Sequence, residues 1–162
     1  MRSRRLVLSA AALGLALAAS GCTSFSPVQT HEFYQAGDGT NANIEQAGAV
    51  FAGVRDAIVV VEDDGTATFH GSVVSYAKED VSVELTGMSG GSTLFSASIS
   101  VPAEGVVDLG ADEGQQEIPL SDFPVKPGEV FDLEVSADGQ SDTISVPVAD
   151  TTLSHLGPPP AG

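Results

Sequence analysis

Apolar and polar residues alternate one by one along much of this chain, and this period of two restricts the fold more than any other feature. Every second residue is apolar in Val81–Leu85, Phe95–Val101, Phe131–Val135 and Ile144–Val148. Successive side chains of a β-strand point to opposite faces, so each run predicts a strand with one buried and one solvated face. A helix needs apolar residues three and four positions apart, and these runs lack that spacing.

One further segment predicts a strand of a different kind. Ala57–Val61 is apolar throughout and mostly β-branched, which is typical of a strand covered on both faces. Glu62–Gly65 follows it and contains the Asp-Gly pair of tight hairpin turns, leading into a strand expected over 66–75. Further turn signals lie at Gly87–Ser92, Ala103–Gly105, Gly110–Gly114 and Lys126–Gly128. Many short strands at this spacing predict an all-β fold, specifically an antiparallel two-sheet sandwich.

The N-terminal 21 residues have the pattern of an export signal. Three arginines, the first at Arg2, precede the apolar segment Leu6–Ala19, whose 14 residues are too few to span a bilayer. Small residues then lead to Gly21 and Cys22. This order predicts a lipoprotein signal that is cut between Gly21 and Cys22, after which the Cys22 sulfur carries a diacylglyceryl group. The alternative is an ordinary secretory signal cut after Ala16–Ala18.

These boundaries divide the chain into four parts. Residues 1–21 are the signal peptide, 22–43 the lipidated cysteine with a polar tether, 44–150 the β-sandwich domain, and 151–162 a proline-rich disordered tail. Two or more acyl chains anchor a protein stably because each buried methylene contributes about 0.8 kcal/mol. We therefore expect the domain at the extracytoplasmic face of the cell membrane, with the membrane as its first partner.

Charge and cysteine content exclude several functions. The whole chain has a formal charge of −16, and removal of residues 1–21 leaves 3 basic residues against 22 acidic ones, or −19. A field of this sign repels nucleic acid, so we expect no nucleic-acid partner. Cys22 is the only cysteine. The mature domain is therefore expected to fold without a disulfide and to lack thiolate catalysis and cysteine-bound metals.

The remaining residues offer few candidates for a chemical site. His70, in a predicted strand, and Met88, at a predicted turn, are the residues that could together bind copper. The other histidines fall in the tether and the tail. Several carboxylates, namely Asp63, Asp64, Asp112, Glu113 and Glu117, lie in turns without the ligand spacing of a calcium loop. Nucleophile-elbow, phosphate-loop and zinc-cluster motifs are absent. The sequence thus predicts a protein that is not an enzyme and has no cofactor.

Three segments of the chain resemble known proteins. Val101–Leu109, Pro124–Leu133 and Val146–Val148 together resemble the second half of the periplasmic copper-chaperone domain. The lipidation signal, the tether and the approach Gly39–Asn43 are similar to the actinobacterial LpqE-like envelope lipoproteins. The similarity in pattern spans roughly residues 40 to 150. It implies an immunoglobulin-like or cupredoxin-like Greek-key sandwich outside the cytoplasm.

The resemblance does not bring copper binding with it. The chaperones hold copper(I) with histidine and methionine, whose soft donors match that ion. Where that family has a histidine and, two residues later, a methionine, this chain has Gln115 and Glu117. On the upstream strand, where the family has another such pair, only His70 and Met88 offer a counterpart.

We therefore expect a lipid-anchored domain with a non-catalytic binding or scaffold role towards another envelope component, either a protein or a wall polymer. An extracytoplasmic copper metallochaperone with degenerate ligands is the alternative. A hydrolase acting on wall material is a third possibility with the least support. It stays open because paired carboxylates at glycosidase separation cannot be recognised from sequence alone.

Overall fold

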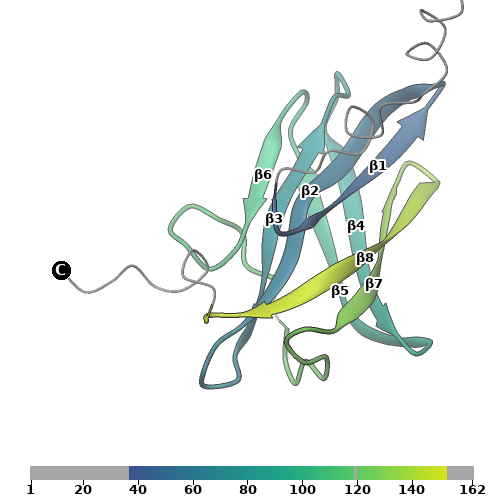
Figure 1. Cartoon of the computed structure of the whole chain (residues 1–162). Helices are drawn as coiled ribbons and strands as arrows, with labels where there is room; N and C mark the ends of the chain where they lie inside the picture. The colour runs from purple at the N-terminus through teal and green to yellow at the C-terminus, as the bar shows by residue number, and fades with distance from the viewer. Residues whose placement is uncertain (1–36, 119, 153–162) are drawn as a thin grey trace, which may run out of the picture. The chain divides into compact units, whose positions relative to one another are not determined.

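Eight β-strands make up the part of the chain that the computed structural model describes, residues 37–118 and 120–152, and no helix occurs within those ranges (Figure 1). The strands are β1 (Thr40–Gln46), β2 (Ala49–Val61), β3 (Ala67–Ser75), β4 (Val81–Ser89), β5 (Ser92–Val101), β6 (Val106–Leu109), β7 (Val130–Ala137) and β8 (Gln140–Asp150). The predicted all-β class is confirmed. The predicted signal peptide, Cys22, most of the tether and the tail from residue 153 lie outside the described residues.

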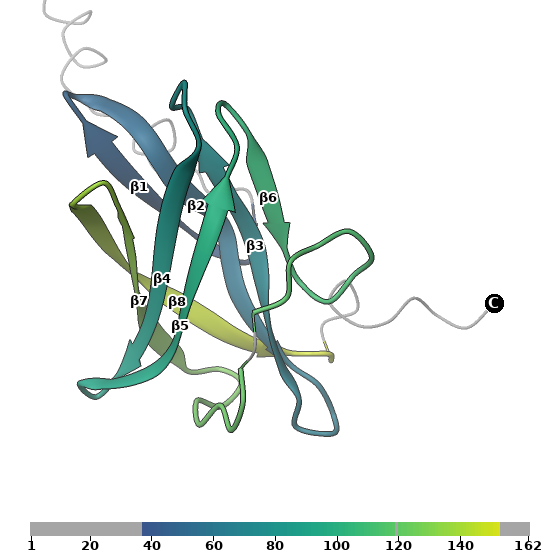
Figure 2. The ribbon, with the colours of Figure 1, turned by 180° about the vertical axis from the view of Figure 1, so that it is seen from behind.

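The strands form one mixed sheet that curls into a half-barrel (Figures 1 and 2). Their order is β5-β4-β7-β8-β2-β3-β6, and β1 also pairs with β2. The expectation of a purely antiparallel arrangement is wrong at one ladder, because β8 runs parallel to β2 from Val148 to Asp150. The 11 residues of β8 pair first with β7 and then, at the end of the strand, with β2. One long strand therefore joins the two parts of the sheet.

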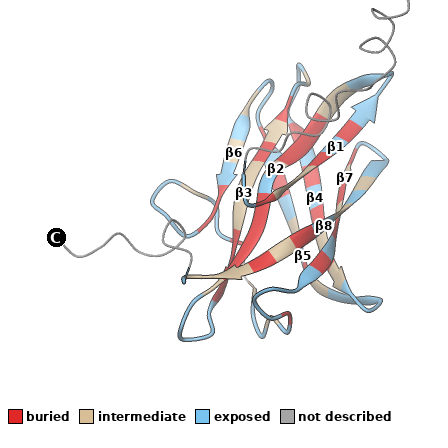
Figure 3. Ribbon diagram, viewed as in Figure 1, coloured by how far each residue is buried: buried red, intermediate tan, exposed pale blue. Residues whose placement is uncertain are grey.

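The burial pattern follows the alternation in the sequence. In β4, Val81, Val83 and Leu85 are buried while the residues between them are exposed. In β7 the buried residues alternate with exposed or half-buried ones. Figure 3 shows these buried positions as red bands along the strands. Ile58 and Val60 of β2 are 5% and 4% exposed, yet neither belongs to the central core cluster. This strand is thus covered on both faces, as its continuous apolar run predicts.

The hairpin between β2 and β3 also forms where it is expected. Glu62 donates its N–H to the Thr66 carbonyl at 2.8 Å, and Gly65 donates to the Glu62 carbonyl at 2.9 Å. Gly65 has a φ of 87°, a conformation that glycine adopts without steric cost. The Asp64 carboxylate accepts the Thr66 N–H at 2.9 Å. This backbone hydrogen bond, followed by one from the Thr66 side chain, lowers the pKa of Asp64, because each stabilises the charged form of the carboxylate.

A chain of phenylalanine rings crosses the core. Phe95 lies 5.9 Å from Phe69 and 5.9 Å from Phe131, and Phe123 lies 5.5 Å from Phe131, measured between ring centroids. Gly87 is opposite Phe95 in the β4–β5 ladder, and its missing side chain leaves the space that the Phe95 ring occupies. The ring chain therefore connects β5, at one end of the strand order, with β3, the strand next to the other end, through the interior.

β1 is held differently on its two sides. Its ladder is with β2, whereas side chains join it to β8. Thr40 donates its hydroxyl to the Ser145 carbonyl at 2.9 Å, and the Asn43 N–H donates to the Asp142 carboxylate at 3.0 Å. The first strand thus begins four residues before the predicted domain start at residue 44.

Within the described ranges, no helix is long and apolar enough to cross a membrane.

Candidate functional site

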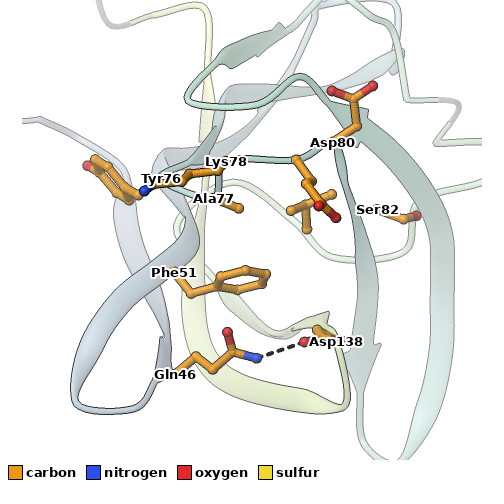
Figure 4. A pocket seen from close by; sticks show the side chains of 10 residues that line it. Gln46, Phe51, Tyr76, Ala77, Lys78, Asp80, Ser82 and Asp138 are labelled. Carbon is orange, nitrogen blue, oxygen red and sulfur yellow. Dashed lines mark hydrogen bonds between the residues drawn. The ribbon is translucent and has the colours of Figure 1, made fainter.

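A hollow of about 680 Å³ opens at one end of the half-barrel (Figure 4). Three connections surround it: the β1–β2 hairpin, the segment between β3 and β4, and the turn between β7 and β8. Its lining residues are Gln46, Phe51, Tyr76, Ala77, Lys78, Glu79, Asp80, Val81, Ser82 and Asp138. We call this feature the end hollow. Its volume lies in the range typical of sites for small ligands.

Phe51 supplies the apolar part of the end hollow. The β1–β2 register passes from Ile44 opposite Ala52 to Glu45 opposite Val50, so Phe51 is an extra residue in β2. Such a bulge redirects a side chain. The Phe51 ring packs against the core and points into the hollow, where it is half-buried (Figure 4). An aromatic surface is thus partly exposed beside the core at this end of the domain.

The β3–β4 segment forms the rim. Tyr76 is 58% exposed and lies at the edge of the hollow with its ring directed outward (Figure 4). The Tyr76 N–H donates to the Phe51 carbonyl at 2.9 Å, which ties the rim to the bulge. The Asp80 carboxylate accepts the Ala103 N–H at 3.0 Å, and the Ala77 carbonyl accepts the Glu104 N–H at 2.8 Å. These bonds hold the rim to the β5–β6 turn.

Asp138 lines the end hollow on the side opposite the β3–β4 segment. Its carboxylate accepts a hydrogen bond of 2.7 Å from the side-chain amide of Gln46, which joins the two hairpins. Glu79, Asp80 and Asp138 give the hollow three carboxylates against the single cation of Lys78. An aromatic floor and a mainly acidic rim together suit a group that carries positive charge beside an apolar part. Among the lining residues there is no histidine or cysteine to act as base or nucleophile.

A second feature marks the point where the chain enters the domain. The Gly39 N–H donates to the Asp56 carboxylate at 2.8 Å, and the Asp56 N–H donates to the Asn41 side chain at 2.8 Å. Asp56 has a φ of 52° at an irregularity in the β2–β3 ladder. A Cβ on Gly39 would lie 2.3 Å from the Asp56 carbonyl carbon. Gly39 and Asn41 therefore fasten the start of β1 to β2, which is a structural role.

The two candidate copper ligands lie on two strands that do not pair with each other. His70 is on β3 beside Gly110, and Met88 is on β4, opposite Thr93 and Asp132. Three strands, β7, β8 and β2, separate β3 from β4 in the sheet order. Residues 37–118 and 120–152 contain no group of three or more His, Cys, Asp or Glu side chains placed to hold a metal.

The other carboxylates of the sequence analysis have local roles or face solvent. Asp63 and Asp64 lie in the β2–β3 turn, and Glu113 and Glu117 are exposed in the connection after β6. In that connection, Asp112 accepts the Gln115 N–H through its backbone carbonyl at 3.1 Å. These positions form turns and do not converge on one point.

Comparison with known proteins gives no family for this chain: no protein-family model matches it, and no curated protein matches it significantly.

Sequence reasoning missed the end hollow. Its residues come from three connections that are distant in the sequence, and a period-two pattern gives no information about which strand ends meet. One sequence feature did indicate the end hollow: Tyr76 lies between a predicted strand and the charged run Lys78–Asp80. An aromatic residue beside charges in a loop is typical of a binding surface.

Proposed function

We propose that this protein is a lipid-anchored lipoprotein of the cell envelope whose β domain binds another envelope component without catalysis. The end hollow is the proposed binding site. The observation that carries the proposal is the aromatic floor of Phe51 beneath an acidic rim, at an open end of the domain. The predicted lipidation of Cys22 supplies the membrane attachment.

The position of the end hollow suits this arrangement. The chain from the proposed anchor enters at Gly37–Gly39, beside Asp56, whereas the hollow begins at Gln46 at the other end of β1. The seven residues of β1 span roughly 20 Å at about 3.4 Å each. The hollow is therefore separated from the entry point by the length of a strand and is accessible to a component in the envelope.

We also propose that the curled sheet is a variant of the immunoglobulin-like or cupredoxin-like Greek-key sandwich. The two segments of the sheet that β8 connects would correspond to the two layers. The support is that β8 pairs with β7 along most of its length and with β2 at its end, and that the buried side chains of both segments belong to one core cluster.

The binding site is tested with two matched variants. Tyr76→Ala removes an exposed aromatic residue from the rim, and Val130→Ala removes an apolar residue that is equally exposed, at 59%, outside the end hollow. Tagged full-length protein is titrated into detergent-solubilised envelope, and the amount of each co-purified component is measured. We expect saturable recovery of one component that Tyr76→Ala reduces and Val130→Ala leaves unchanged. Equal recovery with both variants would contradict the proposed site.

The anchor is tested independently of the site. Mass spectrometry of the native protein should find a chain beginning at Cys22 with acyl chains on it. An unmodified cysteine would refute the lipoprotein assignment while leaving the binding test valid.

A further inference from the structure

β5 forms one end of the strand order and has a free backbone edge. It pairs with β4 on one side, and in the described part of the chain no other backbone hydrogen bond reaches it. Figure 2 shows β5 and β6, the two ends of the order, on either side of the open side of the half-barrel. Ile118 and Val125 from the β6–β7 connection fill the interior with side chains. Within the described residues, the backbone N–H and C=O groups on the outer edge of β5 therefore have no backbone partner.

This edge lacks the usual protection against strand pairing. Natural edge strands are commonly short or carry charged residues or proline. β6 is four residues long, whereas β5 has ten residues and contains no charge, proline or glycine, in a chain with 22 acidic residues. An extra residue at Leu94 interrupts the ladder near the start of β5, and Phe95–Val101 is regular. A regular edge of this length can accept an added strand.

The sheet face beside this edge indicates the charge of the added strand. Glu84 on β4 lies opposite Ser98 of β5, and Glu134 and Asp132 follow on β7. β4, β5, β7 and β8 contain no lysine, arginine or histidine. Apart from Met88, Val130 and Pro147, the outer face thus carries mainly hydroxyl and carboxylate groups, and these four strands place no cation on it. Basic side chains on a neighbouring strand would complement it.

We propose that the free edge of β5 binds an extended segment of a partner protein in which basic and apolar residues alternate. Backbone hydrogen bonds to Phe95–Val101 would hold the segment, as in other cases of strand addition. Its basic side chains would lie on the face that carries Glu84, and its apolar side chains would cover the interior side. This site is separate from the end hollow and does not depend on it.

The test uses full-length protein in detergent and a capped heptapeptide of alternating lysine and valine. Binding is measured by titration, and its location by amide hydrogen exchange. We expect exchange to slow at alternate residues of Phe95–Val101. Replacing lysine by glutamate in the peptide, or methylating alternate peptide nitrogens, should weaken binding at least about tenfold.

Two variants with the same charge change give the matched control. Ser98→Lys places a cation on the edge strand opposite Glu84, whereas Thr143→Lys places one on β8 opposite Glu134, on the same sheet face. We expect Ser98→Lys to weaken peptide binding at least about tenfold and Thr143→Lys to change it less than about twofold.

Four results would overturn the proposal. The first is unchanged exchange in β5 at saturating peptide. The second is an equal effect of Ser98→Lys and Thr143→Lys, which would indicate general electrostatic attraction. The third is a peptide-free dimer in sedimentation experiments that Ser98→Lys dissociates, which would assign the edge to a second copy of the chain. Protection confined to residues around Phe51 would likewise reject the β5 edge and support the end hollow.

Discussion

Replacing Gly87 by alanine should destabilise the domain through one identified steric conflict. A Cβ at this position would lie 2.3 Å from Cε1, 2.6 Å from Cδ1 and 2.9 Å from Cζ of Phe95. Carbon atoms in contact are normally about 3.5–4.0 Å apart, so the ring must retreat by more than roughly 1 Å. Phe69 and Phe131 contact that ring at centroid distances of 5.9 Å each, which leaves little space for the movement.

The expected loss follows from two opposing effects. Inserting a methyl group into a packed core costs about 1–3 kcal/mol. Replacing a strand glycine by alanine lowers the conformational entropy lost on folding, which stabilises the domain by about 0.5–1 kcal/mol. We therefore expect Gly87→Ala to lower the free energy of unfolding by about 1–2 kcal/mol. Equilibrium unfolding in urea, followed by far-UV circular dichroism, measures this change.

A double-mutant cycle isolates the contact. Phe95→Leu alone removes part of the ring chain and is expected to cost about 1–2 kcal/mol through lost burial and a residual cavity. In the double variant, the new methyl group occupies space that the Phe95 ring fills in the natural chain and that the smaller leucine leaves empty. The combined loss should therefore be smaller than the sum of the single losses by more than about 0.5 kcal/mol. Additive losses, or a neutral Gly87→Ala variant, would refute the steric explanation.

Three further predictions follow from other parts of the structure. Gly39→Ala places a methyl group against the backbone of Asp56, so we expect β1 to detach locally from β2. Amide hydrogen exchange in β1 should then become faster, and unchanged exchange would contradict this prediction. The pKa of Asp64 is lowered by hydrogen bonds from Thr66, so its carboxylate stabilises the fold above its ordinary pKa of 3.8, and this stabilisation is lost as pH falls further. Urea unfolding of Asp64→Asn should accordingly depend less on pH below about 4 than that of the natural chain. Copper(I) titrated against a competing chelator should stay with the chelator, and transfer to the protein would restore the metallochaperone alternative.

The two proposed binding surfaces have different chemistry and are separable. The end hollow offers the side chains of Phe51 and Tyr76 within an acidic rim, whereas β5 offers its backbone. Association of a basic partner with either surface is expected to weaken as salt is added. The formal charge of −16 attracts cations, and salt screens this attraction by shortening the Debye length. Backbone pairing at β5 should be the less salt-sensitive of the two.

The period of two in the sequence determined the all-β class and the inward residues of β4, β5, β7 and β8, because neighbouring side chains of a strand must point to opposite faces. It also predicted the double burial of β2 at Ile58 and Val60, since apolar residues in succession leave no polar face. The Asp-Gly pair at Asp64 and Gly65 located the hairpin between β2 and β3 through its tolerance of positive φ.

Only the tertiary structure decided which strands meet. The parallel pairing of β8 with β2 and the free edge of β5 follow from pairings between residues far apart in the chain, and local alternation carries no information about them. The end hollow arose in the same way, since Phe51 turns inward through a register shift against β1 and Asp138 reaches Gln46 across 92 positions. Local sequence specifies which face of a strand is buried, whereas the packing of the whole sheet specifies which surfaces remain open for binding.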